Sequence, residues 1–182
     1  MKRMARTAAH ISTLPMPDRD HIQGPGDAPI KLVEYGDYEC PYCGAAYPIV
    51  KAIQERLGSR LCFAFRNFPL ANAHPHAEHA AEAAEAAHEQ GRFWEMHDLL
   101  YENQDALEDE DLARYASSLG LDARRFIGEI QDEAHASRIR EDFRGGAHIG
   151  VNGTPSFFVN GARYDGPCDV ESLLAALTGQ SL

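Results

Sequence analysis

The chain has 182 residues, of which 44% are hydrophobic and 25% are charged. A chain of this size can bury a core without disulfide bonds to hold it together, so we expect one compact domain. The formal net charge is -11, from 28 acidic and 17 basic residues, which makes nucleic acid and anionic membrane surfaces poor partners. No apolar stretch approaches the roughly 18 residues that a membrane-spanning helix needs.

Residues 1–26 are predicted to form an irregular arm. They lack the apolar core of a secretory signal and are rich in proline and glycine: Pro15, Pro17, Gly24, Pro25 and Gly26. With Met1 as the natural start, we expect a cytoplasmic protein, or a periplasmic one if the start was trimmed. In the cytoplasm, the glutathione and thioredoxin pools would tend to keep thiols reduced.

A Cys-Pro-Tyr-Cys motif at residues 40–43 follows a predicted strand. Residues 30–35 form an apolar, β-branched run that is typical of a strand. Apolar residues then recur at helical spacing up to Gly58, which predicts a helix: Ala46, Val50, Ile53 and Leu57. Cys40 therefore falls near the N-cap of this helix, with Pro41 in the first turn, where a proline loses no hydrogen bond.

The predicted place of Cys40 favours thiolate chemistry. Unpaired amides and the positive end of the helix dipole face a sulfur at a helix N-terminus. Comparable sites lower the pKa of a cysteine from about 8.5 to roughly 3.5–7.5, and the thiolate is the nucleophile in disulfide exchange. We therefore expect Cys40 to be the exposed, attacking thiol and Cys43, one turn on, to be the more buried, resolving thiol.

A zinc site is the alternative interpretation of a Cys-x-x-Cys motif. Zinc needs four ligands, and the other two cysteines, Cys62 and Cys168, are isolated in the sequence. No carboxylate or cysteine completes a tetrahedral set with the histidines of residues 74–79. We therefore favour redox chemistry with no metal, and expect these histidines to cap and solvate the start of an alanine-rich helix.

A second predicted strand covers residues 61–65, and the chain then reads as almost wholly helical. The predicted helices cover residues 76–90, 93–101, 109–119, 122–131 and 133–147, the last with Ile139, Phe143 and Ala147 facing inward. Further on, Asn160-Gly161 between two strand-like runs predicts a hairpin whose first strand begins at Pro155. A final helix is predicted for residues 169–177.

The Cys-x-x-Cys motif and Thr154-Pro155 together resemble the DsbA-like branch of the thioredoxin-fold thiol:disulfide oxidoreductases. Other matching features are Glu34 at the place of a buried acid, Pro48 in the active-site helix, residues 65–70, the alanine-rich helix after residues 74–76, and residues 90–98. The resemblance covers roughly residues 27–180. It implies an α/β, thioredoxin-like fold whose core, residues 27–72 and 150–182, carries a helical insertion at residues 73–149.

The resemblance also implies the roles of the site residues. In this family the Thr-Pro bond is cis and packs against the Cys-x-x-Cys motif, which places four residues at the substrate: Pro41, Tyr42, Thr154 and Pro155. The backbone of Thr154 would pair with an extended substrate. Glu34 would relay the proton of Cys43 through a water, although an edge carboxylate facing solvent is the alternative. The partners would be protein thiols and disulfides and a recycling reductant or oxidant, with no organic cofactor.

Two departures from the family pattern bear on the redox potential, and one of them also suggests another function. Pro41-Tyr42 is the dipeptide typical of glutaredoxins, which suggests a glutathione-dependent reductase with Arg66 as a contact for the tripeptide. The charge of Glu39, directly before Cys40, would oppose thiolate formation. A third possibility is a redox-responsive binding or chaperone module, in which the cysteines switch an interface instead of turning over a substrate.

The two remaining cysteines are expected to be free. Cys62 alternates with apolar neighbours on the second predicted strand, which favours a buried, inert thiol. Cys168 is predicted at the start of the last helix, where its pKa could be lowered, and is a minor candidate for glutathionylation. A bond between them would have to join the first-edge strand to a helix at the opposite edge of the sheet, which exceeds the reach of a disulfide.

Overall fold

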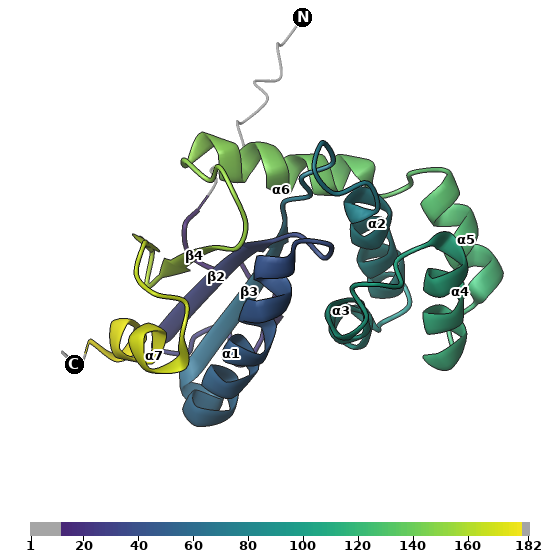
Figure 1. Cartoon of the computed structure of the whole chain (residues 1–182). Coiled ribbons are helices and arrows are strands. Elements are labelled where there is room, and N and C mark those ends of the chain that lie inside the picture. Colours follow the sequence, from purple (N-terminus) through teal and green to yellow (C-terminus); the bar gives the residue numbers. More distant parts are fainter. Residues whose placement is uncertain (1–11, 180–182) are drawn as a thin grey trace, which may run out of the picture.

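The computed structural model describes residues 12–179 and contains one five-stranded sheet with helices on both faces (Figure 1). The strands are β1 (His21–Gln23), β2 (Ile30–Gly36), β3 (Leu61–Asn67), β4 (Ser156–Val159) and β5 (Ala162–Tyr164). The helices are α1 (Pro41–Leu57), α2 (Ala77–His88), α3 (Phe93–Glu102), α4 (Asp109–Ser118), α5 (Ala123–Gln131), α6 (Ala136–His148) and α7 (Val170–Thr178), with a 3-10 turn, η1 (Gly58–Arg60), after α1. No helix of the described part is long and apolar enough to cross a bilayer.

The sheet has the strand order β1-β3-β2-β4-β5. Its central pair, β2 and β3, is parallel, because α1 carries the chain back to the edge where β2 began. The other three pairs are antiparallel, and β4 and β5 form the predicted hairpin at Asn160-Gly161. These features confirm the thioredoxin-like fold with a helical insertion.

The N-terminal arm was expected to be irregular up to residue 26, and this prediction was wrong for β1. Residues 21–23 pair with residues 63–65 of β3, which places β3 inside the sheet and not at its edge. Only three residues pair, and the flanking prolines and glycines hide so short a strand from pattern analysis. Residues 1–11 of the arm lie outside the described part.

The two faces of the sheet bury different side chains of β2, since neighbouring residues of a strand point to opposite sides. Leu32 packs into the larger core with α1 and α7, and Val33 and Tyr35 pack into the smaller core on the other face, where α6 lies. Glu34, two residues from Leu32, therefore points toward α1. This alternation positions a carboxyl group beneath the start of that helix.

Helices α2–α6 form the insertion between β3 and β4, and α2 is its central element (Figure 1). The small side chains of α2 let neighbouring helices approach from several sides, and its alanines are almost all buried: Ala77, Ala80, Ala81, Ala83, Ala84, Ala86 and Ala87. Two glutamates of the same helix are also buried and hydrogen-bonded. Glu85 binds His21 and Asn67, and Glu82 accepts the amide of His135.

Helix α6 begins at residue 136, not 133, and its buried face differs from the predicted one. Ile139 is buried as expected, but Phe143 is 36% exposed and stacks on Phe68, and Ala147 is exposed. The buried stripe runs through Asp142, which accepts the amide of Asn67, and through a glycine pair at residues 145–146. Apolar periodicity missed this face because a carboxylate and two glycines form it.

Candidate active site

Cys40 is the N-cap of α1, as predicted. Its backbone is extended (φ -69°, ψ 121°), and Pro41 occupies the first helical position. The Cys40 thiol donates to the carbonyl oxygen of Thr154 at 3.4 Å, which joins the motif to a segment 114 residues away in the sequence. The side chain is only 3% exposed, so the expectation of an exposed thiol was wrong: the loop before β4 covers the sulfur.

The pKa of the Cys40 thiol is lowered to about 5. The largest cause is a hydrogen bond from the Cys43 thiol, and hydrogen bonds from the Thr154 side chain and from the amides of Cys43 and Tyr42 act in the same direction. Together they outweigh burial, which alone would raise the pKa. The Thr154 hydroxyl is buried without a hydrogen-bond partner among the described residues, so it is free to donate to the sulfur once Cys40 ionises. The Cys40 thiol is therefore unusually acidic, and it gives up its hydrogen bond to the Thr154 carbonyl when it ionises.

Cys43 has the opposite character. Its side chain is completely buried, one turn further along α1. Burial raises the pKa of its thiol far above the ordinary value, and the hydrogen bond that it gives to Cys40 and the charge of Glu34 add to this effect. Cys40 is thus the more acidic thiol of the pair and Cys43 the less acidic one.

Glu34 lies under this pair and is 2% exposed, which excludes the alternative of a solvent-facing carboxylate. No described group donates to its Oε1 atom. Burial, together with the charge of Cys40, raises the pKa of Glu34 to about 8. The hydroxyl of Tyr101 is also buried without a partner, and its pKa responds mainly to burial and then to Cys43 and Glu34. Two buried polar atoms, one of Glu34 and one of Tyr101, are thus without a hydrogen-bond partner among the described residues.

A groove of about 380 Å³ runs beside the motif and is lined by three of the four residues expected at the substrate: Tyr42, Thr154 and Pro155. The Thr154–Pro155 peptide bond is cis, and both residues line the groove opposite the first turns of α1. Tyr42 is 75% exposed at its rim. Most of the lining is apolar, from Tyr42, Ala45, Ala46, Ile49, Thr154, Pro155 and Cys168. Pro41, the first residue of α1, lies between Cys40 and Tyr42.

Cys168 borders this groove, before α7, whose N-cap is Asp169. Its pKa is raised, first by burial and then by the charges of Glu34 and Asp169, so the expectation of a lowered pKa was wrong. Cys62 is fully buried on β3, and its pKa is also raised, mainly by burial. Cys62 and Cys168 are free, as expected, and so are Cys40 and Cys43.

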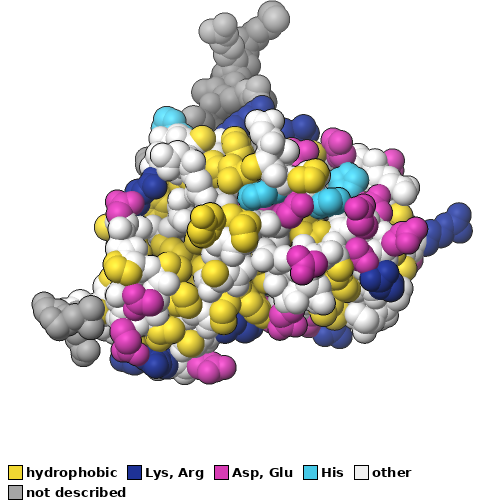
Figure 2. Space-filling view, viewed as in Figure 1, with side chains coloured by type: hydrophobic (Ala, Val, Ile, Leu, Met, Phe, Trp, Pro, Cys, Tyr) yellow, Lys and Arg dark blue, Asp and Glu magenta, His cyan; other side chains and the backbone are white. Residues whose placement is uncertain are grey.

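Histidine–carboxylate pairs surround the entrance to the site. Glu39 accepts the amide of His76 at 2.6 Å and its Nδ1 at 2.9 Å, and Nε2 of the same ring contacts Glu108. Next to it, His74 contacts Asp37 at 2.7 Å. Figure 2 shows histidine and acidic side chains side by side on this face. His76 is the N-cap residue of α2, but its side chain makes no capping hydrogen bond, so the expected capping role was wrong. His74 and His76 instead compensate acidic side chains beside Cys40.

Glu39 consequently acts on Cys40 less than its sequence position suggests. The hydrogen bond to Glu39 is the largest cause of a raised pKa at His76, so this imidazole holds its proton to higher pH than usual. A protonated His76 paired with Glu39 offsets the negative charge of this carboxylate, which would otherwise oppose ionisation of Cys40. No group of three metal-ligating side chains occurs within residues 12–179.

Replacing His76 with alanine is expected to raise the pKa of Cys40. The variant leaves Glu39 without its cation, and the shift should be roughly a few tenths of a pH unit because the pair is partly exposed. The measurement is the pH dependence of Cys40 alkylation. His79, whose Nδ1 pairs with Asp109, supplies the control variant His79→Ala. An unchanged midpoint in His76→Ala would show that Glu39 does not act on Cys40.

Arg66 does not belong to the site. It is 1% exposed and is paired with Asp20 at 2.7 Å, and it also donates to the Tyr35 hydroxyl and to the carbonyl of Leu14. All of its nitrogens thus serve the junction between the N-terminal segment and β3. The expectation that Arg66 contacts glutathione was therefore wrong.

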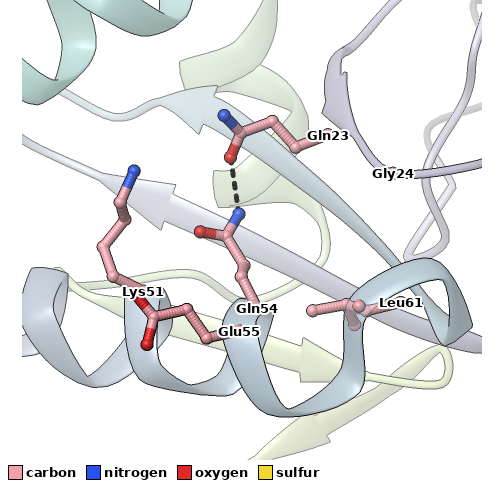
Figure 3. A pocket seen from close by; sticks show the side chains of 7 residues that line it. Gln23, Gly24, Lys51, Gln54, Glu55 and Leu61 are labelled. Carbon is pink, nitrogen blue, oxygen red and sulfur yellow. Dashed lines mark hydrogen bonds between the residues drawn. The ribbon is translucent and has the colours of Figure 1, made fainter.

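A second hollow, of about 520 Å³, lies at the other end of α1 (Figure 3). Gln54 donates to the side-chain oxygen of Gln23 across it at 2.6 Å, and Lys51 and Glu55 line its mouth. None of the groups that carry the redox chemistry reaches this hollow.

Fold and site together define a thiol–disulfide oxidoreductase domain of DsbA-like type. The thioredoxin family model matches residues 17–178, and the chain belongs to this family. BdbD from Bacillus subtilis, in its oxidised form, has the same fold: the TM-score is 0.82 with 24% identity, over 93% of this chain and 97% of that one. A thioredoxin-like oxidoreductase from Silicibacter pomeroyi matches with a TM-score of 0.78 and 25% identity, over 88% of this chain and 91% of that one.

The chain also matches one part of much longer proteins. It is 51% identical over 161 residues to a Salinispora tropica protein named Na(+)/H(+) antiporter NhaA 3, which is 88% of this chain and 24% of that protein. The chain thus spans about a quarter of the length of the curated relatives it matches. These names give no support to the expectation that a membrane is not a partner of the domain.

Proposed function

We propose that this domain exchanges disulfides with protein substrates through Cys40 and Cys43. The observation that carries the proposal is the contrast between the two thiols: a Cys40 pKa of about 5 at the edge of an apolar groove, and a buried Cys43 with a raised pKa behind it. A thiolate next to a neutral thiol can form a mixed disulfide and then resolve it.

The reduction of a substrate would proceed in two displacements. The Cys40 thiolate attacks one sulfur of the substrate disulfide, a mixed disulfide forms, and the other substrate sulfur leaves as a thiolate. Cys43 then loses its proton and attacks the sulfur of Cys40, which releases the second substrate thiolate. Two electrons pass to the substrate, and Cys40 and Cys43 end as a disulfide. The reverse sequence oxidises a substrate dithiol.

Glu34 is the proposed acceptor of the Cys43 proton. A general base works best when its pKa lies near the operating pH, and the Glu34 value of about 8 meets this condition. Its free oxygen has no competing donor among the described residues. A water bridging the carboxyl group and the thiol would complete the path.

The cis-proline loop is the proposed binding surface for the substrate chain. Thr154 places its carbonyl group beside the attacking sulfur, and an extended substrate pairing with this backbone would bring its own sulfur to the same point. The apolar lining of the groove, with the exposed Tyr42 at its rim, favours a loose sequence preference.

The lowered pKa of Cys40 also sets the direction of exchange. In the reduced protein the Cys40 thiolate stabilises the folded state. This contribution to stability is fully present above the unfolded pKa of the thiol, near 9, and it is lost as the pH falls through the folded pKa of about 5. At pH 7 much of this contribution remains, and it favours the reduced form, so the disulfide is more oxidising than one without thiolate stabilisation. We infer a site that gives its disulfide away more readily than thioredoxin does.

Insulin reduction with dithiothreitol tests the function. Steady turnover without glutathione supports protein disulfide exchange, whereas a redox-responsive binding module would show no turnover. Dependence on glutathione would support the glutaredoxin-like alternative. In that case a residue other than the buried Arg66 would have to bind the tripeptide. The Cys40→Ala variant is the control for uncatalysed reduction by dithiothreitol.

The cytoplasmic location stays a prediction, and it has a measurable consequence. A site with a stabilised thiolate would be held reduced by the glutathione pool, and would then act on substrates as a reductant or isomerase. Alkylating the thiols in intact cells before lysis separates reduced from oxidised protein on a gel. A mostly oxidised population would contradict the prediction.

A further inference from the structure

Gln104 reaches the redox motif from the helical insertion. It lies between α3 and α4, and its side-chain nitrogen Nε2 donates to the carbonyl oxygens of Tyr38 at 2.8 Å and of Cys40 at 2.9 Å. Both hydrogens of one amide group are thereby used on the segment that leads into α1. Two hydrogen bonds from one planar group fix the relative direction of the two peptide units that accept them.

These two bonds complete the support of the turn before α1. At the start of the turn, Asp37 accepts the amides of Glu39 and, through its carbonyl group, of Cys40. At its end, the Cys40 carbonyl accepts the amide of Gly44 at 3.0 Å, and Gln104 is its second donor. The Cys40 peptide unit is therefore held from both sides.

The orientation of this peptide unit determines which backbone amides face the Cys40 sulfur. Hydrogen bonds from the amides of Tyr42 and Cys43 contribute to the lowered pKa of Cys40. Such bonds require the N-cap residue to keep its extended backbone while the next residues turn into the helix. Without the hydrogen bond from Gln104, the Cys40 carbonyl group would be less well fixed, and the sulfur could move away from these amides.

Gly44 provides an independent indication that the contact matters. A Cβ atom at this position would lie 1.9 Å from Oε1 of Gln104 and 2.6 Å from its Cδ atom. The glycine is inside α1 and does not have a positive φ, so the helix backbone itself does not require it. Glycine inside a helix costs roughly 0.5–1 kcal/mol relative to alanine. Its presence makes room for the amide of Gln104.

We propose that Gln104 is a positioning residue of the redox site: it orients the Cys40 peptide unit so that the first amides of α1 face the sulfur, and Gly44 is the residue that admits it. The inference deepens the proposed function and rests on it for its biological meaning. It also means that the insertion adjusts the reactivity of Cys40 through one side chain, in addition to covering the site.

The test compares Gln104→Met, which keeps the length of the side chain but cannot donate, with Gly44→Ala, which displaces the amide. The readout is the pH midpoint of Cys40 alkylation by iodoacetamide. We expect both variants to raise the midpoint by about half a pH unit, which slows alkylation at pH 5 by about twofold. The double variant should show no more than the larger single effect, because both changes break the same contact.

Gln54→Met is the matched control. Gln54 lies on α1, the helix that Cys40 caps, and binds Gln23 at the opposite end of that helix (Figure 3). Its midpoint should equal that of the wild type, even if its melting temperature falls. An unchanged midpoint in Gln104→Met, or additive shifts in the double variant, would overturn the proposal. Gln104→Met alone carries the test if Gly44→Ala does not fold. Alkylation needs no substrate, so a failure of insulin turnover would not affect this result.

Discussion

Replacing Cys43 with alanine is expected to turn the protein into a trap for its substrates. Cys40 keeps its place at the N-cap of α1 and still attacks, but no second thiol lies behind it to release the product. Loss of the Cys43 thiol also removes the largest cause of the lowered Cys40 pKa, so the trap should form more slowly than the first step of the wild type. Multiple turnover should be abolished.

The covalent adducts of Cys43→Ala should appear on non-reducing gels and disappear with dithiothreitol. Cys40→Ala should form few or none, because its remaining thiol at residue 43 is buried and has a raised pKa. Cys168→Ser, placed in the Cys43→Ala background, checks the third thiol of the groove and should leave the adducts unchanged. Equal trapping by the two single variants would mean that nucleophile and resolving thiol are wrongly assigned.

Replacing Glu34 with glutamine is expected to make the stability of the protein less dependent on pH. The folded pKa of Glu34, about 8, lies above its ordinary value of 4.5. A raised pKa means that its stabilising contribution is fully present below about pH 4.5 and is lost as the pH rises through 8. Since each pKa unit is worth about 1.4 kcal/mol, the wild type should lose several kcal/mol over this range relative to Glu34→Gln.

Urea unfolding of both proteins at pH 4.5, 6 and 8 measures this difference. The reduced forms should show the larger effect, because the Cys40 thiolate is the second cause of the raised pKa and is absent from the disulfide. Parallel stability curves for wild type and Glu34→Gln would show that the carboxyl group titrates normally. Slower resolution of the mixed disulfide by Glu34→Gln would separately support its role as the proton acceptor.

Local patterns in the sequence predicted the parts of the site that depend on neighbouring residues. The apolar spacing after residue 43 and the proline at residue 41 placed Cys40 at a helix N-cap, and the structure has it there. The Asn160-Gly161 pair likewise predicted the hairpin of β4 and β5. The resemblance to DsbA-like proteins added the long-range approach of residues 154–155 to the motif, which no local pattern contains.

Contacts between distant segments could not be predicted in the same way. Gln104 lies more than 60 residues from the carbonyls that it binds, and its neighbours in the sequence carry no sign of this role. The compensation of Glu39 by His76 also depends on how α2 packs, so Glu39 looked like an obstacle to the thiolate. The burial of Cys40 depends on the loop before β4, and a helix pattern alone leaves that sulfur exposed.

The redox potential of the Cys40–Cys43 pair, measured against glutathione between pH 4 and 8, tests the stabilised thiolate most directly. We predict a value at pH 7 clearly above the roughly -270 mV of thioredoxin, toward the roughly -120 mV of DsbA. The dependence of the potential on pH should change slope near pH 5, where Cys40 gains its proton. A potential near -270 mV with no change of slope below pH 7 would contradict a thiolate held by the first turn of α1.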